Sequence, residues 1–135
     1  MLLDGQIEKV KDILTTKLSP YFIILFGSSA TNRYRKSSDI DLAFLASKSI
    51  SAYDLFMIGQ EIANSLDRDV DLIDLNKAST VMQMEIIYHG KVLYSTDEMK
   101  RKEFEMKVFK MYTKLNEERQ VVLEAIKESG EIYGK

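Results

Sequence analysis

The dipeptide Gly27-Ser28 is followed by ten further residues and then by Asp39-Ile40-Asp41. Glycine lets the backbone approach a phosphate closely, and the serine adds a hydroxyl and an N–H beside it. Asp39 and Asp41 share one face of a strand. There they would bridge two divalent ions about 3.5–4 Å apart, the spacing of two-metal phosphoryl chemistry. The motif predicts a site that holds a nucleoside triphosphate with magnesium and transfers a nucleotide.

Apolar strands are predicted on both sides of this motif. One strand, Tyr21–Phe26, leads directly into Gly27, and a second, Ile40–Leu45, carries the aspartates near its start. A third strand, Asp69–Leu75, follows a short polar turn, and a short extended piece comes at Lys91–Tyr94. These strands are the elements that must position the motif.

The third strand supplies a candidate for a third carboxylate. Neighbouring strands are about 4.8 Å apart, so a side chain from this strand is within reach of the second strand if the two pair. Asp71 is the best candidate to join Asp39 and Asp41. Asp69 shares the face of Asp71, whereas Asp74 should point away. We therefore expect three aspartates in one acidic site.

The spacing of apolar residues and the capping signals predict four helices. They are expected at about residues 3–18, 51–66, 76–88 and 96–130. Pro20 ends the first helix, Ser51 opens the second, and Asn76 is expected to cap the third. Strands and helices in this order predict an α/β (α+β) fold: a small mixed sheet covered by helices on one side.

The composition is typical of one globular domain. The 135 residues include 19 basic and 21 acidic side chains, one histidine and no cysteine. The nearly balanced charges provide no basic field for direct nucleic-acid binding. The N-terminal residues do not have the pattern of a signal peptide, and the apolar runs are too short for a membrane span. A cytoplasmic enzyme or binding protein is the expectation.

With Gly-Ser, Asp-x-Asp and a third aspartate in strand order, the chain resembles the DNA polymerase β-like nucleotidyltransferases. Among them it is most similar to the minimal nucleotidyltransferases (MNT), and the likeness covers most of the chain. Further segments resemble MNT antitoxins that pair with HEPN ribonuclease toxins: Val70–Leu75, Gly90–Tyr94, Arg101–Glu105, Tyr112 and Arg119. The resemblance implies a polymerase β-like nucleotidyltransferase fold.

The resemblance also implies a role for each residue of the motif. Ser28 would contact the phosphates of ATP, Asp39 and Asp41 would bind magnesium, and Asp71 would assist them and activate the attacking hydroxyl. It implies that AMP passes from ATP to a tyrosine of a partner HEPN toxin, which silences the RNase activity of the toxin.

The polar segment between the first two strands contains the remaining candidates for nucleotide binding, in addition to Gly27 and Ser28. Arg33 is a candidate for triphosphate contact, with a solvated loop as the alternative. Ser29 and Ser38 are candidates for nucleotide contact or for capping the loop.

Two positions depart from the pattern of the family. Its members often read Gly-Ser-x-Ala-Arg-Gly, and here Thr31 and Asn32 stand in place of the arginine and the glycine. This departure motivates an alternative function, a non-catalytic antitoxin that inhibits its toxin by direct binding. A further alternative is a nucleotidyltransferase of the aminoglycoside type that modifies a small molecule, although such chains usually have an additional substrate-binding domain.

The last predicted helix is too long for a domain of this size. It would measure about 50 Å at 1.5 Å per residue, whereas the domain should be about 30–35 Å across. We expect residues 1–95 to form the nucleotidyltransferase core and residues 96–135 to form a helical extension. Its overhanging apolar positions, Leu115, Val122 and Ile126, predict a protein partner, in a homo-dimer or in a hetero-oligomer.

Overall fold

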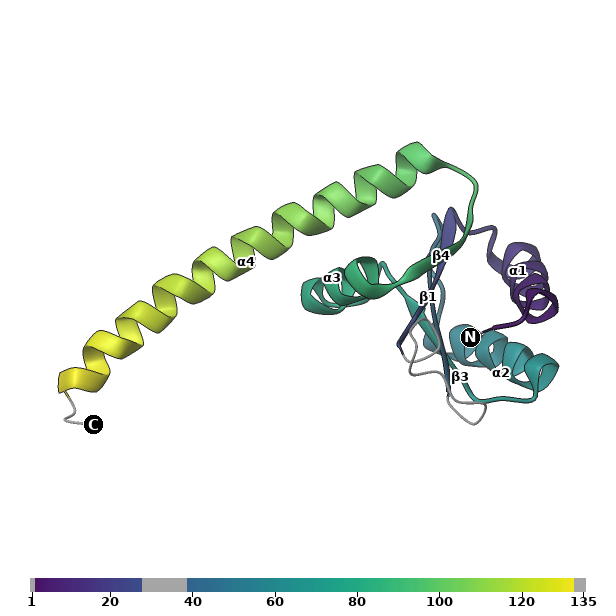
Figure 1. Ribbon diagram of the computed structural model, residues 1–135, viewed down its shortest axis with the longest axis horizontal. Helices are drawn as coiled ribbons and strands as arrows, with labels where there is room; N and C mark the ends of the chain where they lie inside the picture. Colours follow the sequence, from purple (N-terminus) through teal and green to yellow (C-terminus); the bar gives the residue numbers. More distant parts are fainter. Residues whose placement is uncertain (1, 28–38, 133–135) are drawn as a thin grey trace.

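The computed structural model of the chain describes residues 2–27 and 39–132, with side chains through residue 129. Figure 1 shows a small sheet with helices packed around it and one helix that extends far from it. The elements in chain order are α1 (Asp4–Leu18), β1 (Phe22–Phe26), β2 (Ile40–Leu45), α2 (Ala52–Leu66), β3 (Val70–Asp74), α3 (Thr80–His89), β4 (Lys91–Ser95) and α4 (Glu98–Ile132). The predicted helices and strands are therefore present, within a few residues of the predicted bounds.

The four strands form one mixed sheet in the order β3-β2-β1-β4. β1 runs antiparallel to both β2 and β4, whereas β2 and β3 are parallel. The prediction that the third strand lies beside the second is confirmed. A parallel pair requires a crossover connection, and α2 provides it between β2 and β3.

Helices cover both faces of the sheet, so the prediction of helices on one side is wrong (Figure 1). α1 and α2 pack against Ile23 and Leu25 of β1, whereas α3 and the first turns of α4 pack against Phe22 and Ile24. The physical reason is the composition of β1 and β2, whose side chains are apolar on both faces. A strand of this kind needs a cover on each side.

The cap of α3 differs from the prediction. Ser79 caps this helix by accepting a hydrogen bond from the Met82 N–H at 3.1 Å, so Asn76 is not the cap. Asn76 lies in the turn after β3, where its Nδ2 donates to the Ala46 carbonyl at 2.8 Å. It therefore ties the turn after β3 to the end of β2. The other cap was predicted correctly: Ser51 Oγ accepts from the Asp54 N–H.

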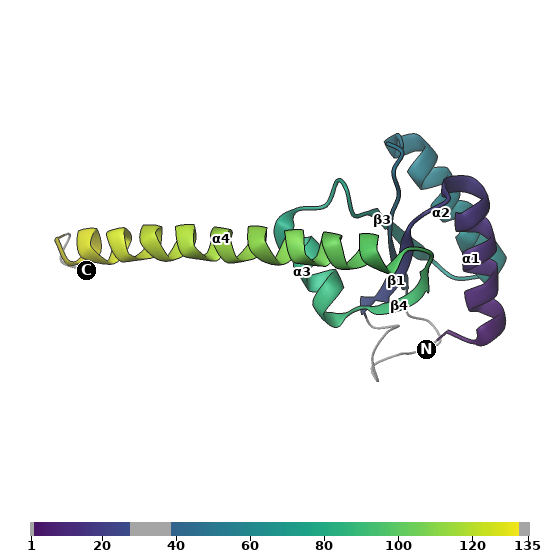
Figure 2. The same ribbon diagram turned by 90° about the horizontal axis from the view of Figure 1, so that it is seen from above.

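α4 has 35 residues, about 52 Å at 1.5 Å per residue, and it projects well beyond the sheet (Figures 1 and 2). Its first turns are anchored, because Val108 is buried and the Phe104 ring packs on the Phe22 ring with centroids 5.8 Å apart. Residues 116–129 are all exposed. The predicted overhang is confirmed. In the described part of the chain no helix combines the length and the apolarity needed to cross a membrane.

We expect a methyl group at Gly90 to destabilise this fold. A Cβ at that position would overlap Cγ2 of Ile24 and the carbonyl oxygen of Ile86, and this carbonyl accepts the last hydrogen bond of α3, from the Gly90 N–H at 2.8 Å. Gly90→Ala should lower the free energy of unfolding by about 1–3 kcal/mol in urea denaturation, as overpacking usually does.

Gly5 provides the matched control. It lies in α1, and a Cβ added there meets nothing within 4 Å. Gly5→Ala should raise the free energy of unfolding by up to about 1 kcal/mol, because alanine restricts the unfolded chain. A Gly90→Ala protein as stable as the Gly5→Ala protein would contradict the tight contact at the end of α3.

Candidate active site

The motif residues meet at one edge of the sheet. Gly27 follows the last residue of β1, and Asp41 and Asp71 are the second residues of β2 and β3. In the strand register, Asp41 lies opposite Phe26 on one side and opposite Asp71 on the other. Directly paired positions share a face, and neighbouring strands are about 4.8 Å apart. The structure therefore brings Gly27, Asp41 and Asp71 together, as the sequence predicts.

The carboxylates lie on the side of the sheet that α3 and α4 cover. Ile40 and Leu42 flank Asp41 in β2, and both belong to the core under α1 and α2. Because side chains alternate along a strand, Asp41 lies on the opposite face. Ala43, two residues further along, is part of the core under α3 and α4. Any group that reacts at Asp41 must approach from this side.

Gly27 is held against the Asp41 carboxylate. Its φ is +71°, in the left-handed region that favours glycine. A Cβ at this position would overlap Oδ2 of Asp41 and lie 3.0 Å from its Cγ. Only a residue without a side chain fits here, so the backbone that leads into the Gly-Ser motif passes directly over the acidic site.

Burial and repulsion act together on Asp41. Its side chain is half-buried, and this burial is the main cause that raises the pKa of its carboxyl, followed by the negative charges of Asp71 and then Asp39. Asp39 is exposed and lies immediately before β2, and Asp71 is exposed at the start of β3. The three predicted aspartates thus interact electrostatically across one site.

This site has the ligand chemistry that magnesium requires. Mg²⁺ prefers oxygen ligands, above all carboxylates, and a divalent cation here would relieve the repulsion that raises the pKa of Asp41. Within residues 2–27 and 39–132, no three acidic or histidine side chains are already grouped as a complete metal centre. Asp39, Asp41 and Asp71 fit the ion as ligands, and their assignment stays a prediction.

Other candidates fall outside this cluster. Ser28, Ser29, Arg33 and Ser38 lie outside the described residues, so their roles stay predictions. Asp74 is buried, and its Oδ1 accepts a hydrogen bond from the Asn76 N–H at 2.9 Å. It stabilises the turn after β3, in agreement with the prediction that it points away from the site.

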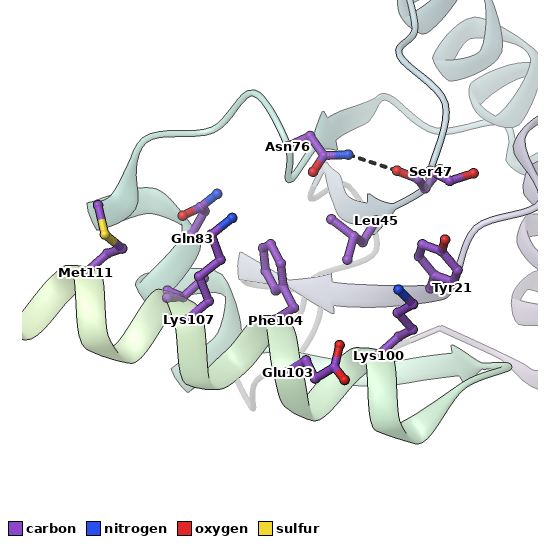
Figure 3. Close-up of a pocket in the computed structure, with 12 residues that line it drawn as sticks. Tyr21, Leu45, Ser47, Asn76, Gln83, Lys100, Glu103, Phe104, Lys107 and Met111 are labelled. Atoms are coloured by element: carbon purple, nitrogen blue, oxygen red, sulfur yellow. Dashed lines mark hydrogen bonds between the residues drawn. The ribbon is translucent and has the colours of Figure 1, made fainter.

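A cavity lies at the ends of β1 and β2 that are opposite the acidic site (Figure 3). It has a volume of about 410 Å³ between the first turns of α4 and the strand ends, where Phe104 and Lys107 face Leu45. Lys100 reaches over Tyr21 here, with Nζ 5.6 Å from the ring centroid. Asp41 and Asp71 do not line this cavity, so it does not belong to the acidic site.

Comparison with known proteins gives the family. The family model described as "Polymerase beta, Nucleotidyltransferase" matches residues 8–99. This range includes Gly27 and all three candidate aspartates. The chain belongs to the polymerase β-like nucleotidyltransferase family, and the resemblance predicted from the sequence is confirmed.

Individual relatives are similar over most of their length. The chain is 37% identical over 107 residues to the protein adenylyltransferase MntA of Shewanella oneidensis. The aligned region covers 77% of this chain and 74% of MntA. A crystal structure of a toxin–antitoxin with AMP-PNP matches with 33% identity and a TM-score of 0.82, covering 92% of this chain and 98% of the other.

A third comparison concerns a modified toxin. The structure of a tri-AMPylated HEPN toxin of Shewanella oneidensis in complex with its MNT antitoxin contains a chain that is 32% identical to this one. The match has a TM-score of 0.77 and covers 90% of this chain and 96% of the other. The match therefore extends beyond the family domain into α4.

The raised pKa of Asp41 predicts a stability gain when its charge is removed. A carboxyl with a higher pKa in the folded state than in the unfolded state binds its proton more tightly when folded, so its ionisation lowers stability above the unfolded pKa. Asp41→Asn should therefore raise the Tm of the metal-free protein at pH 7 by at most a few degrees, because solvent at this half-exposed site screens part of the repulsion.

The gain should shrink as the pH falls through the pKa of Asp41, because the wild-type carboxyl is then neutral as well. Thermal unfolding at several pH values in EDTA measures both effects. Asp12→Asn, an exposed position of α1, is the control and should change the Tm very little. A lower Tm for Asp41→Asn at pH 7 would contradict the account of burial and repulsion.

Proposed function

We propose that this protein is a magnesium-dependent protein adenylyltransferase that acts as an antitoxin. In this proposal it transfers AMP from ATP to a tyrosine hydroxyl of a partner HEPN toxin and so neutralises the toxin. The observation that supports it most directly is the position of Asp41 beside Asp71 and against Gly27. The identity of 37% with a protein adenylyltransferase supports the choice of reaction.

Asp39, Asp41 and Asp71 would hold two magnesium ions in this proposal. Bound magnesium neutralises triphosphate charge and aligns the α-phosphorus with the attacking oxygen. Gly27 would lie beside the triphosphate, because its backbone passes beside the Asp41 carboxylate. The remaining predicted nucleotide contacts are Ser28, Ser29, Arg33 and Ser38.

Asp71 is the residue that an acceptor hydroxyl would meet. It is exposed, whereas Asp41 is half-buried behind Gly27. In the proposed step the hydroxyl oxygen forms a bond to the α-phosphorus, the bond from that phosphorus to the bridging oxygen breaks, and pyrophosphate leaves. The hydroxyl proton passes to the Asp71 carboxylate, which acts as general base.

In this proposal the two parts of the chain have different roles, catalysis and toxin binding. We propose residues 1–95 as the catalytic core, in agreement with the family match to residues 8–99. The extension at 96–135 would bind the toxin through Leu115, Val122 and Ile126 in a hetero-oligomer. We place the complex in the cytoplasm in this proposal.

Labelled ATP tests the reaction. The protein, Mg²⁺ and a purified HEPN toxin are incubated with α-labelled or γ-labelled ATP. Label should appear on the toxin from α-labelled ATP only. Asp39→Asn and Asp41→Asn should abolish the transfer, and Asp71→Asn should slow it by about 10²–10⁴, the usual contribution of a general base.

Asp12→Asn serves again as the control and should transfer at the wild-type rate. Label from γ-labelled ATP would mean phosphoryl transfer and would overturn the mechanism. Transfer that persists in both Asp39→Asn and Asp41→Asn would place the chemistry at another site.

The binding-only antitoxin is the second candidate, and the exposed apolar overhang of α4 favours it. Val122 and Ile126 are 55% and 59% exposed, which suits a stable complex without any chemistry. In that case Asp39→Asn would still neutralise the toxin, whereas Val122→Asp would not. If the enzyme is correct, growth assays with the toxin should show that both variants fail. The small-molecule alternative has no such support, because residues 2–27 and 39–132 form no second substrate-binding domain.

A further inference from the structure

α3 exposes large apolar side chains on the side that faces α4. Val81 and Tyr88 are 37% and 74% exposed, and they line a groove of about 300 Å³ together with Met84 on α3 and Tyr112 on α4. Positions 81, 84 and 88 share one helix face. We call these four residues the α3–α4 corner. Its polar lining includes Glu85 and His89, whose Oε2 and Nε2 atoms lie 3.7 Å apart.

The face of α4 that lines this corner continues along the overhang. Positions 108, 112, 115, 122 and 126 follow helical spacing on one side of α4. Val108 is buried, Tyr112 and Leu115 are half-buried, and Val122 and Ile126 are exposed. The face that packs on the core near the sheet is therefore uncovered further out, where Arg119 interrupts the apolar positions between Leu115 and Val122. A partner that covers it lies on the α3 side of α4 (Figure 1).

The α3–α4 corner also lies on the side from which an acceptor must come. Asp41 and Asp71 occupy the sheet face that α3 and α4 cover. α3 ends at His89, and Lys91 of β4 then pairs with Leu25, two residues before Gly27. β4 lies two strand spacings from β2, about 10 Å. The exposed end of α3 thus stands between the overhang of α4 and the acidic site.

We propose that the HEPN toxin docks in the α3–α4 corner, with Tyr88 as an anchor, and not on the overhang of α4 alone. This inference rests on the proposed function, which supplies the partner. A toxin that covers Val122 and also presents a tyrosine at Asp71 has to pass over α3, so the corner is continuous with the proposed contact on α4. Exposed tyrosines are frequent anchors of protein interfaces.

The experiment measures the Kd between the full-length chain and a purified HEPN toxin. Tyr88→Asp should weaken binding by at least about tenfold, the effect typical of an anchor residue, and should slow AMP transfer to the toxin. Phe56→Asp is the matched control, because Phe56 is 61% exposed on α2, which packs on the opposite face of the sheet. It should bind as the wild type does.

Two further measurements separate the possible outcomes. Circular dichroism establishes that each variant is folded, and binding of ATP with Mg²⁺ to Tyr88→Asp establishes that the nucleotide site is intact. Unchanged toxin binding by Tyr88→Asp, with weaker binding by Val122→Asp, would contradict docking of the toxin in the α3–α4 corner. The proposed function would be unaffected by that result. Wild-type protein that neither binds nor modifies the toxin would overturn both.

Discussion

Two carboxylates that repel each other, Asp41 and Asp71, stand directly opposite one another on parallel strands, and the site depends on this register. A shift of one residue would turn Asp41 into the core under α1 and α2. The apolar side chains of β2 prevent such a shift, because Ile40, Leu42 and Phe44 are all fully buried in that core. Hydrophobic packing on the sheet face under α1 and α2 therefore holds the register that brings the two carboxylates together on the other face.

The same arrangement explains why the site costs stability. Asp41 is half-buried, and this burial, followed by the negative charges of Asp71 and Asp39, raises the pKa of its carboxyl. Gly27 adds to the enclosure, because its backbone passes where a side chain would collide with Asp41. The stability that the hydrophobic core provides outweighs the cost of burying the Asp41 charge beside other carboxylates. A site built in this way suits the cation and the phosphate of the proposed function rather than the stability of the protein alone.

Much of the fold and of the acidic site could be predicted from the sequence, because the sequence signals for them are local or periodic. Continuous apolar runs gave the strands, and their alternation placed Asp71 on the face of Asp41 before the pairing was known. The continuous apolar run of β1 already called for a cover on both faces, and the prediction of one covered side overlooked it. Which helices supply the second cover depends on how α3 and α4 turn back onto the sheet. Asn76 was misassigned as a cap because its amide serves a distant carbonyl, that of Ala46. A hydrogen bond between residues thirty positions apart cannot be recognised from the few neighbouring residues on which a cap prediction rests. The roles of residues 28–38 stay predictions.

In the proposed function, α4 separates recognition from chemistry within a small chain. Its start is anchored by Phe104, whose ring packs on the Phe22 ring, and by the buried Val108. Within the helix, Arg101 pairs with Glu98 and Glu105 at 2.6 and 2.7 Å. Beyond residue 115 packing against the sheet ends, and helix propensity alone does not account for three adjacent exposed apolar residues, Val121 to Leu123. Their exposure is unfavourable in the isolated chain. It becomes favourable when a partner covers them, so the length of α4 is best explained by a surface that is completed in a complex.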